Sequence, residues 1–347
     1  MKNQLIKPKP RLLVIVGPTA SGKSTLALRL ARWLGSAQAR EKFDVGGAEI
    51  VSADSRQIYR GMDVGTAKPR LIAKGKWLMA EGIPHHLIDI KNPNEDYTVA
   101  EYKRDAIRAI HKIIARGKLP IMVGGTGLYV KAVVHNLKIP KVKADLVLRR
   151  ELEAEQKEKG AGFLMGELVS IDPDAAYVVD PKNTRRVIRA LEIALGEKKL
   201  FSGSRKLGKP LFQTLQIGVG GEKNKLRAQI EHRSREMIQD GLIQEVEKLV
   251  KKFCPSTHST TAQGGEQSRT TELRANALPR AFDAIGYREA IDYLNHKITK
   301  EKLIELLTKN TWQYARRQMT WFKKDPKIYW VKSEKETARL VTRFLKN

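Results

Sequence analysis

The chain has 347 residues, which is enough for one large domain or two smaller ones. Hydrophobic residues make up 41% of it, and no apolar run approaches the ~18 residues that a membrane span needs. Its single cysteine, Cys254, excludes an intrachain disulfide. These features predict a cytoplasmic protein without a membrane partner. The formal net charge of +27 favours a polyanionic partner such as nucleic acid.

The first 135 residues alternate predicted strands and helices. Strands are expected at Leu12–Val16, Glu49–Ala53, His86–Ile90 and Leu119–Val123, and helices at Thr25–Leu34 and Val99–Arg116. This alternation is typical of an α/β fold in which helices wrap a parallel sheet. Ligands of such sheets bind at the carboxyl ends of the strands.

The pattern changes from residue 141 to 206, where charged, helix-prone segments predict a helical insertion domain. The core, 1–140 and 207–347, resumes with an expected strand at Leu211–Val219 and a long helix at Glu222–Lys252. Residues 255–278 are rich in Gly, Ser and Thr, which predicts an exposed, mobile polar loop. The remaining elements expected are helices at Leu278–Leu294 and Lys300–Trp321, a strand at Ile328–Val331 and a terminal helix.

A complete phosphate-loop pattern, GxxxxGK[ST], spans Gly17 to Ser24 between the first strand and the first helix. Backbone N–H groups at a helix N-terminus cradle phosphate oxygens, Lys23 adds a positive charge, and the Ser24 hydroxyl can reach Mg²⁺. The pattern predicts phosphate binding strongly. It does not name a reaction, because hydrolases, kinases and other transferases all use it.

Two further candidates also follow strands. Asp54 comes directly after Val51-Ser52-Ala53, so it is either a general base beside the phosphates or a helix-capping or loop residue. The Gly-rich segment from Gly124 to Gly127 is either a close approach to a ligand, with Thr126 beside it, or a plain strand–helix turn. Asp89 lies within a predicted strand and is either a structural acid or a metal ligand.

The second half of the chain offers candidates on helices. Arg233 is a surface charge unless it faces the phosphate loop. Trp312 to Lys324 interleaves aromatic and basic residues, a pattern expected for contacts with RNA backbone and bases. The alternative is an amphipathic helix whose aromatic residues belong to the core, and both interpretations can hold on different faces.

The combination of motifs resembles the tRNA dimethylallyltransferase family, also called IPP transferases, in its bacterial type. The matching segments are GPTASGKS, DSRQIYRGMDVGTAKP (Asp54–Pro69), HHLIDI (His85–Ile90), GGTGLY (Gly124–Tyr129), Ile285–Arg288 and RRQMTWFKK (Arg316–Lys324). The resemblance implies a P-loop NTPase-like core with a helical insertion domain. It also implies transfer of a dimethylallyl group from dimethylallyl diphosphate to N6 of adenosine 37, in tRNAs that read codons beginning with U.

The resemblance assigns roles to residues of this chain. It implies catalytic roles for Asp54, Thr126 and Arg233, and Mg²⁺ at Ser24, in an enzyme expected to act as a monomer. The diphosphate would be bound by Gly17, Thr19, Ala20, Ser21, Gly22, Lys23 and Ser24. The tRNA would be contacted by Asp54, Ser55, Arg56, Gln57, Arg149, Asn183, Arg186, Ile285, Gly286, Tyr287, Arg288, Arg316, Arg317, Gln318 and Trp321.

Two departures from the family pattern stand out. The polar stretch at 255–278 is longer than the usual connection, and the Cys/His zinc finger of many eukaryotic members is missing, so zinc is not expected. Three alternatives remain open from the residues. They are an isopentenyltransferase acting on free adenine nucleotides, a P-loop small-molecule kinase, and a non-catalytic RNA-binding protein.

Overall fold

The computed structural model describes residues 8–75, 77–139, 145–197, 200–202, 207–254 and 278–346. The chain divides into two units, one formed by Met1–Val133 with Leu211–Asn347 and the other by Val134–Pro210. Of the predicted polar loop at 255–278, all but Leu278 lies outside the described residues.

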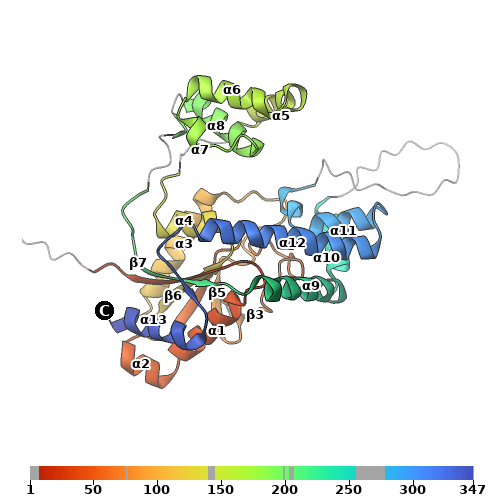
Figure 1. Ribbon diagram of the computed structural model, residues 1–347. Coiled ribbons are helices and arrows are strands. Elements are labelled where there is room, and N and C mark those ends of the chain that lie inside the picture. The colour runs from red at the N-terminus through yellow and green to blue at the C-terminus, as the bar shows by residue number, and fades with distance from the viewer. Residues whose placement is uncertain are drawn as a thin grey trace, which may run out of the picture. The chain divides into compact units, whose positions relative to one another are not determined.

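An eight-stranded sheet forms the centre of the first unit (Figure 1). Its strands are β1 (Arg11–Val16), β2 (Ala48–Ser52), β3 (Ile72–Lys74), β4 (Trp77–Ala80), β5 (Ile83–His86), β6 (Leu119–Gly124), β7 (Gln213–Val219) and β8 (Ile328–Val331). They lie in the order β3-β4-β5-β2-β6-β1-β7-β8. The pairings from β5 to β8 are parallel, whereas β3, β4 and β5 pair antiparallel. The predicted α/β, P-loop NTPase-like fold is thus confirmed.

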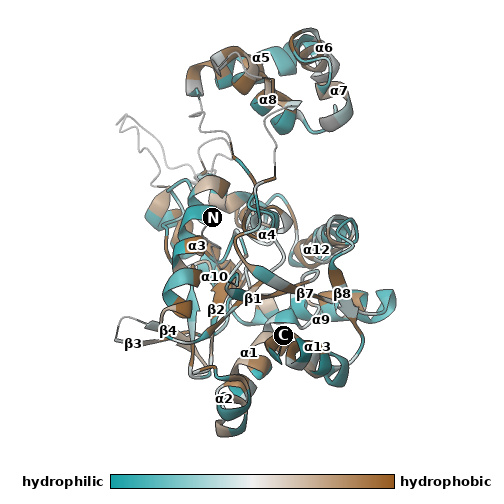
Figure 2. Cartoon of the chain, turned by 90° about the vertical axis from the view of Figure 1, so that its left-hand side faces the viewer, coloured by the Kyte–Doolittle hydropathy of each residue, from teal (hydrophilic) through white to brown (hydrophobic). Residues whose placement is uncertain are grey.

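Helices cover both faces of this sheet. They are α1 (Lys23–Leu34), α2 (Ala37–Phe43), α3 (Val99–Ile114), α4 (Gly127–Val134), α9 (Lys223–Gln239), α10 (Leu242–Phe253), the 3₁₀ helix η3 (Arg280–Asp283), α11 (Tyr287–Leu294), α12 (Lys300–Phe322) and α13 (Glu334–Lys346). A shared apolar core joins α1, α2 and α13 to one face, and α3 packs on the other (Figure 1). Because β1, β2 and β6 are covered on both sides, they are apolar along most of their length, and the central strands are brown in Figure 2.

Two predicted helices are each broken in two, and in both cases a glycine marks the break. The helix expected at 222–252 is interrupted between α9 and α10, where Gly241 has φ 97°. The helix expected at 278–294 is interrupted between η3 and α11, where Gly286 has φ 95°. This left-handed region ends a helix and favours glycine. The apolar spacing runs through both glycines, so periodicity alone gave the wrong boundaries.

The strand predicted at His86–Ile90 is also misplaced, because β5 ends at His86. Leu87 and Asp89 have φ values of 61° and 54°, which an extended strand cannot accommodate. The β3–β4 hairpin and helix α2 have no counterpart in the sequence prediction. All are short elements, for which hydrophobic periodicity carries little signal.

The second unit is helical in its described residues, with no strand among them. It contains α5 (Leu146–Lys159), α6 (Ala161–Ile171), α7 (Ala175–Val178) and α8 (Thr184–Glu197). Leu152, Leu164, Leu168 and Leu191 are buried in its own apolar core. Across the described part of the whole chain, no helix has the length and hydrophobicity to span a bilayer.

Candidate active site

Three loops that carry candidate residues leave the sheet at one edge. Strands β2, β6 and β1 are neighbours and run parallel, so the segments that follow their carboxyl ends lie side by side. These segments begin at Gly17 after β1, at Ala53 after β2 and at Gly125 after β6. The topology therefore brings the phosphate loop, Asp54 and Thr126 together, although they are far apart in sequence.

The phosphate loop has the backbone conformation that its glycines permit. A Cβ atom on Gly17 would lie 2.3 Å from the carbonyl oxygen of Val219, so only glycine fits against β7. Gly22 has φ 80° immediately before α1 begins at Lys23. The loop thus leads directly into a helix N-terminus, where unpaired N–H groups favour an anion.

Lys23 lies where its amine can interact with an anion bound to the loop. Its Nζ donates a hydrogen bond to the Pro18 carbonyl oxygen at 3.0 Å, so the side chain folds back over the loop. Burial lowers the pKa of Lys23 to about 8, and Arg233 pushes the pKa in the same direction while Asp54 opposes it. A phosphate group beside Nζ would favour the charged form.

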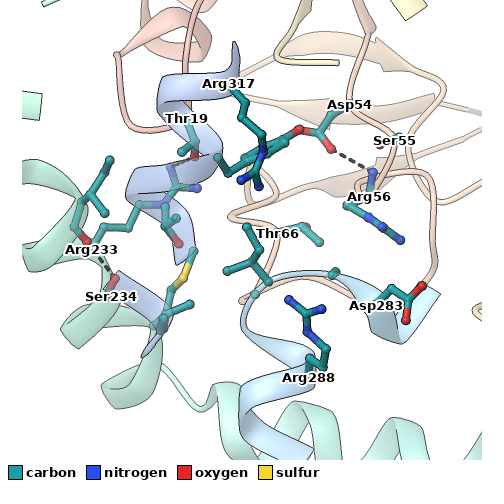
Figure 3. Close-up of a pocket in the computed structure, with 18 residues that line it drawn as sticks. Thr19, Asp54, Ser55, Arg56, Thr66, Arg233, Ser234, Asp283, Arg288 and Arg317 are labelled. Atoms are coloured by element: carbon teal, nitrogen blue, oxygen red, sulfur yellow. Dashed lines mark hydrogen bonds between the residues drawn. The ribbon is translucent and has the colours of Figure 1, made fainter. Parts of the chain in front are cut away.

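Arg233 reaches the loop from helix α9. Its Nη1 donates to the Thr19 hydroxyl oxygen at 3.4 Å, and the two side chains face each other in Figure 3. Burial lowers the pKa of Arg233, with Asp54 opposing this effect. The guanidinium therefore faces the phosphate loop. This position favours a role for Arg233 in the site over the alternative of a solvated surface charge.

Asp54 is held by its own turn. Its Oδ1 accepts the N–H groups of Arg56 at 2.8 Å and Gln57 at 3.4 Å (Figure 3). No hydrogen bond to the other carboxylate oxygen is found within the described ranges. One oxygen thus fixes the orientation of the carboxylate and the other can accept a proton.

Thr126 is bonded to the Asp54 turn on both its backbone and its side chain. Its N–H donates to the Ala53 carbonyl at 3.1 Å, and its Oγ1 accepts the Ser55 N–H at 3.0 Å. A Cβ atom on Gly124 would lie 2.1 Å from the Ala53 carbonyl oxygen, so glycine lets the two strand ends approach. These contacts therefore fix the position of Thr126 relative to the turn that carries Asp54.

A pocket of about 340 Å³ opens in front of these groups (Figure 3). Its polar wall includes Thr19, Asp54, Ser55, Arg56, Asp283, Arg233, Arg288 and Arg317. Its apolar wall includes Ile230, Met237, Ile285 and Leu307. The pocket combines three features that one substrate class would need: an anion site, a carboxylate and an apolar surface.

The residues predicted to contact RNA fall into buried and exposed groups. Ile285 and Arg288 line the pocket, whereas Tyr287 between them is fully buried. The Tyr287 hydroxyl donates to Glu245 at 2.5 Å. Gln57 is not among the residues that line the pocket, and its Nε2 donates to the carbonyl oxygens of Thr66 and Ala67. These positions make Tyr287 and Gln57 supports of the site in this structure.

Helix α12 shows the same division. Arg316, Arg317 and Trp321 are exposed, whereas Gln318 is only 6% exposed and bonds to the two glycine-containing loops. The helix therefore has an inner face that packs on the core and an exposed basic face, and contact of the exposed face with RNA stays a prediction.

The predicted RNA contacts of the second unit lie on α5 and at the start of α8. Arg149 donates from Nε and Nη2 to the buried carboxylate of Glu192, each at 2.8 Å. Asn183 accepts the Arg186 N–H at 3.2 Å and so caps α8. The Arg149 pair ties α5 to α8, so this arginine has a structural role whatever else it contacts.

Sequence reasoning missed three residues that complete the site. Tyr314 lines the pocket and its hydroxyl lies within hydrogen-bonding reach of the Thr126 and Gln318 side chains; burial raises its pKa to about 12. Glu245 accepts the N–H groups of Asp63, Val64 and Gly65. Buried Lys68 donates to Asp63, Asp89 and the Tyr59 carbonyl. The four-residue spacing of Tyr314 and Gln318 was the available signal for a shared helix face.

Lys68 also forms an ion pair with Asp89. The Asp89 carboxylate accepts from Lys68 Nζ at 2.5 Å, which favours the structural alternative over a metal ligand. No group of three or more His, Cys, Asp or Glu side chains suited to a metal exists among the described residues. A cation at this site would therefore depend on the exposed Ser24 hydroxyl, phosphate oxygens and water, a set that Mg²⁺ accepts.

The fold and the pocket define a P-loop protein with a carboxylate and an arginine facing its phosphate loop. A sequence model described as IPP transferase matches residues 57–325. The chain belongs to the IPP transferase family.

Relatives agree along nearly the whole chain. A tRNA dimethylallyltransferase of Pelotomaculum thermopropionicum is 41% identical over 94% of this chain and 92% of its own length. One of Acetivibrio thermocellus is 38% identical over 93% and 92%. The structure is similar to that of a tRNA isopentenylpyrophosphate transferase from Bacillus halodurans, with a TM-score of 0.62, 35% identity and coverage of 97% and 96%. A eukaryotic dimethylallyltransferase acting on tRNA has a TM-score of 0.67 at 26% identity, over 93% of this chain and 73% of its own.

Proposed function

We propose that this protein transfers the dimethylallyl group of dimethylallyl diphosphate to N6 of adenosine 37 in tRNA. The names of its relatives support tRNA prenylation. The observation that carries the assignment is the pocket in which Asp54 and Arg233 face the phosphate loop from opposite sides, next to an apolar wall.

The phosphate loop would hold the diphosphate as a leaving group. The C1–O bond of the donor breaks, its electron pair goes to the diphosphate, and no phosphoryl group is transferred. N–H groups at the start of α1, with Lys23 and Arg233, would stabilise the charge that develops on the departing oxygen. The apolar wall of Ile230, Met237 and Leu307 suits the five-carbon chain.

Asp54 would act as the general base. As N6 of the adenine forms its bond to C1, the amine loses a proton, which the carboxylate oxygen not used by the Asp54 turn accepts. Thr126, fixed to Ser55, would contact the reaction centre. General-base groups contribute about 10²–10⁴-fold to turnover.

The acceptor base would enter from the side of Ser55, Arg56 and Arg288. All three line the pocket. An enzyme that modifies N6 of a base in a folded RNA must take that base out of its stack. The exposed Arg316, Arg317 and Trp321 on α12 would bind the surrounding RNA backbone and bases.

Mg²⁺ would be held by Ser24 together with the diphosphate oxygens, and would neutralise charge on the donor when bound. The remaining sequence predictions, a monomeric state and a cytoplasmic location, stay predictions.

The test uses purified protein, dimethylallyl diphosphate and Mg²⁺ with an anticodon stem-loop that carries adenosines at positions 36 and 37. Nucleoside mass spectrometry should find N6-(dimethylallyl)adenosine at position 37 alone. Efficient modification of AMP without activity on the stem-loop would favour the free-nucleotide alternative. ATP-dependent phosphorylation of a small molecule with no prenyl transfer would favour the kinase.

A further inference from the structure

One buried side chain joins the two glycine-containing loops of the site. Gln318 is 6% exposed, on the inner face of α12. Its Oε1 accepts the Thr19 N–H at 2.8 Å, and its Nε2 donates to the Gly125 carbonyl at 2.9 Å. The two partners belong to different loops, 299 and 193 residues away from Gln318. A primary amide suits this position because it donates and accepts at the same time.

The glycine at position 125 makes the contact possible. A Cβ atom there would lie 2.2 Å from Gln318 Nε2 and 3.5 Å from the Gly17 carbonyl oxygen. The same loop meets α12 a second time, because a Cβ on Gly127 would lie 2.2 Å from the Trp321 ring. The packing of α12 on the second loop therefore leaves no space for a side chain at position 125 or 127, and the Gln318 amide lies where the helix meets both loops.

We propose that Gln318 is a positioning residue, which sets the spacing between the phosphate loop and the loop that carries Thr126. The inference rests on the proposed function. Because β1 and β6 are neighbours in the sheet, only the conformations of their loops determine how far the leaving group lies from Thr126. Gln318 fixes one backbone atom of each loop.

A shift of the second loop would reach the general base. Thr126 follows Gly125 directly, and its N–H and Oγ1 bond to Ala53 and Ser55 on either side of Asp54. Misplacement of reacting groups by about 1 Å can cost about 10²-fold in rate. Gln318 thus acts on turnover through the loops, without touching either substrate.

This role makes a different prediction from a direct RNA contact. A side chain that binds RNA changes the KM for RNA, whereas a side chain that aligns the loops changes kcat. Gln318→Leu keeps the approximate volume and removes both hydrogen bonds. We expect its kcat to fall by about 10- to 100-fold, with the KM for the stem-loop within about twofold of wild type.

A matched control is available on the same helix. Gln313 is an exposed glutamine, five residues before Gln318. Gln313→Leu makes the same chemical change on the exposed face, away from both loops, so kcat should keep its wild-type value even if the KM for RNA rises. A Gln318→Leu enzyme with wild-type kcat and a raised KM for RNA would overturn the proposal.

A second variant gives a signature that general damage to the fold would not. In Gln318→Glu a protonated carboxyl can accept from Thr19 and donate to Gly125, whereas an ionised one has lost the donor. Because this variant keeps the bond to the Thr19 N–H and weakens the bond to the Gly125 carbonyl, kcat should fall while the KM for the stem-loop stays within about twofold of wild type. This variant keeps the amide's shape and serves also if Gln318→Leu does not fold.

The possible outcomes distinguish a failure of the Gln318 proposal from a failure of the proposed function. A Gln318→Glu enzyme with wild-type kcat and a raised KM for RNA would likewise overturn the role of Gln318. Wild-type protein that modifies the stem-loop while both variants turn over at the full rate would overturn only this inference. Wild-type protein with no prenyl transfer would overturn the proposed function, and this inference with it.

Discussion

The loops at the sheet edge and the helices around them place their functional side chains in different ways. At the sheet edge each candidate follows a strand, and the parallel order of β2, β6 and β1 brings Asp54, Thr126 and the phosphate loop together. On the helices, consecutive side chains lie about 100° apart around the axis, so neighbours in sequence can differ completely in burial. Arg288 lines the pocket beside buried Tyr287, and Arg317 is exposed beside buried Gln318. A segment on a helix is therefore not a site until its packing is known.

Among the residues on loops at the sheet edge, Asp54 offers the sharpest test, through the variant Asp54→Asn. The amide keeps the shape and can accept the N–H groups of Arg56 and Gln57, but it cannot take a proton from N6. We expect kcat to fall by about 10²–10⁴-fold. Binding of a non-hydrolysable donor analogue, measured by calorimetry, should be largely kept. Turnover within threefold of wild type would remove Asp54 from the role of general base.

Arg233 joins the two sides, since it lies on a helix and faces the phosphate loop. Arg233→Met removes a charge that would stabilise the leaving diphosphate, so we expect a loss of about 10²–10³-fold in kcat/KM for the donor. Arg233→Lys should recover part of this loss, because the charge remains and the forked geometry does not. Steady-state kinetics with varied donor measure both. A loss confined to the KM for RNA would place Arg233 with the RNA contacts instead.

Arg149 tests whether a helix residue predicted to bind RNA has a structural role. Its pair with buried Glu192 ties α5 to α8, and its side chain is only 17% exposed. Leaving a buried charge unpaired typically costs about 3–5 kcal/mol. Glu192 keeps its ion pair with Arg189 at 3.0 Å, so we expect Arg149→Met to destabilise residues 134–210 by less than this range. Hydrogen exchange of α5 and α8 reports it. Unchanged protection together with weaker RNA binding would make Arg149 a contact residue only.

The smallest effect concerns pH and Lys23. Its pKa, lowered to about 8 by burial, means that the amine loses its charge as pH rises through 8 in the free enzyme. Diphosphate stabilises the charged form, so donor binding should weaken above pH 8, by up to about tenfold per pH unit, and should take up protons. The KM for the donor, measured against pH, reports the weaker binding. Calorimetry in two buffers with different ionisation enthalpies reports the proton uptake. Lys23→Met should show neither dependence.

The sequence predicts the sheet and its edge loops better than it predicts the helices around them. The α/β core is predictable because buried parallel strands are continuous apolar runs, and the phosphate loop because its glycines and lysine have fixed spacing. The helix breaks at Gly241 and Gly286 are not predictable, because the apolar periodicity of the sequence continues through both glycines. Glu245 and Lys68 escape prediction because their partners are backbone groups and carboxylates that lie together only after folding.

Tyr314 and Gln318 show the limit most clearly. Both lie in a segment that the sequence singles out, yet composition describes only the exposed face of α12. The inner face is defined by what it packs against, the two glycine-containing loops. A spacing of four residues indicates a shared face but not which face is buried.

The central claim is that the phosphate loop holds a diphosphate that leaves intact while an RNA amine takes the prenyl group. ³¹P NMR of a complete reaction with dimethylallyl diphosphate and the stem-loop tests this claim directly. If the claim holds, inorganic diphosphate is released in equal amount to N6-(dimethylallyl)adenosine, and no orthophosphate forms. Orthophosphate as the released species, or diphosphate release without a modified adenosine, would contradict it.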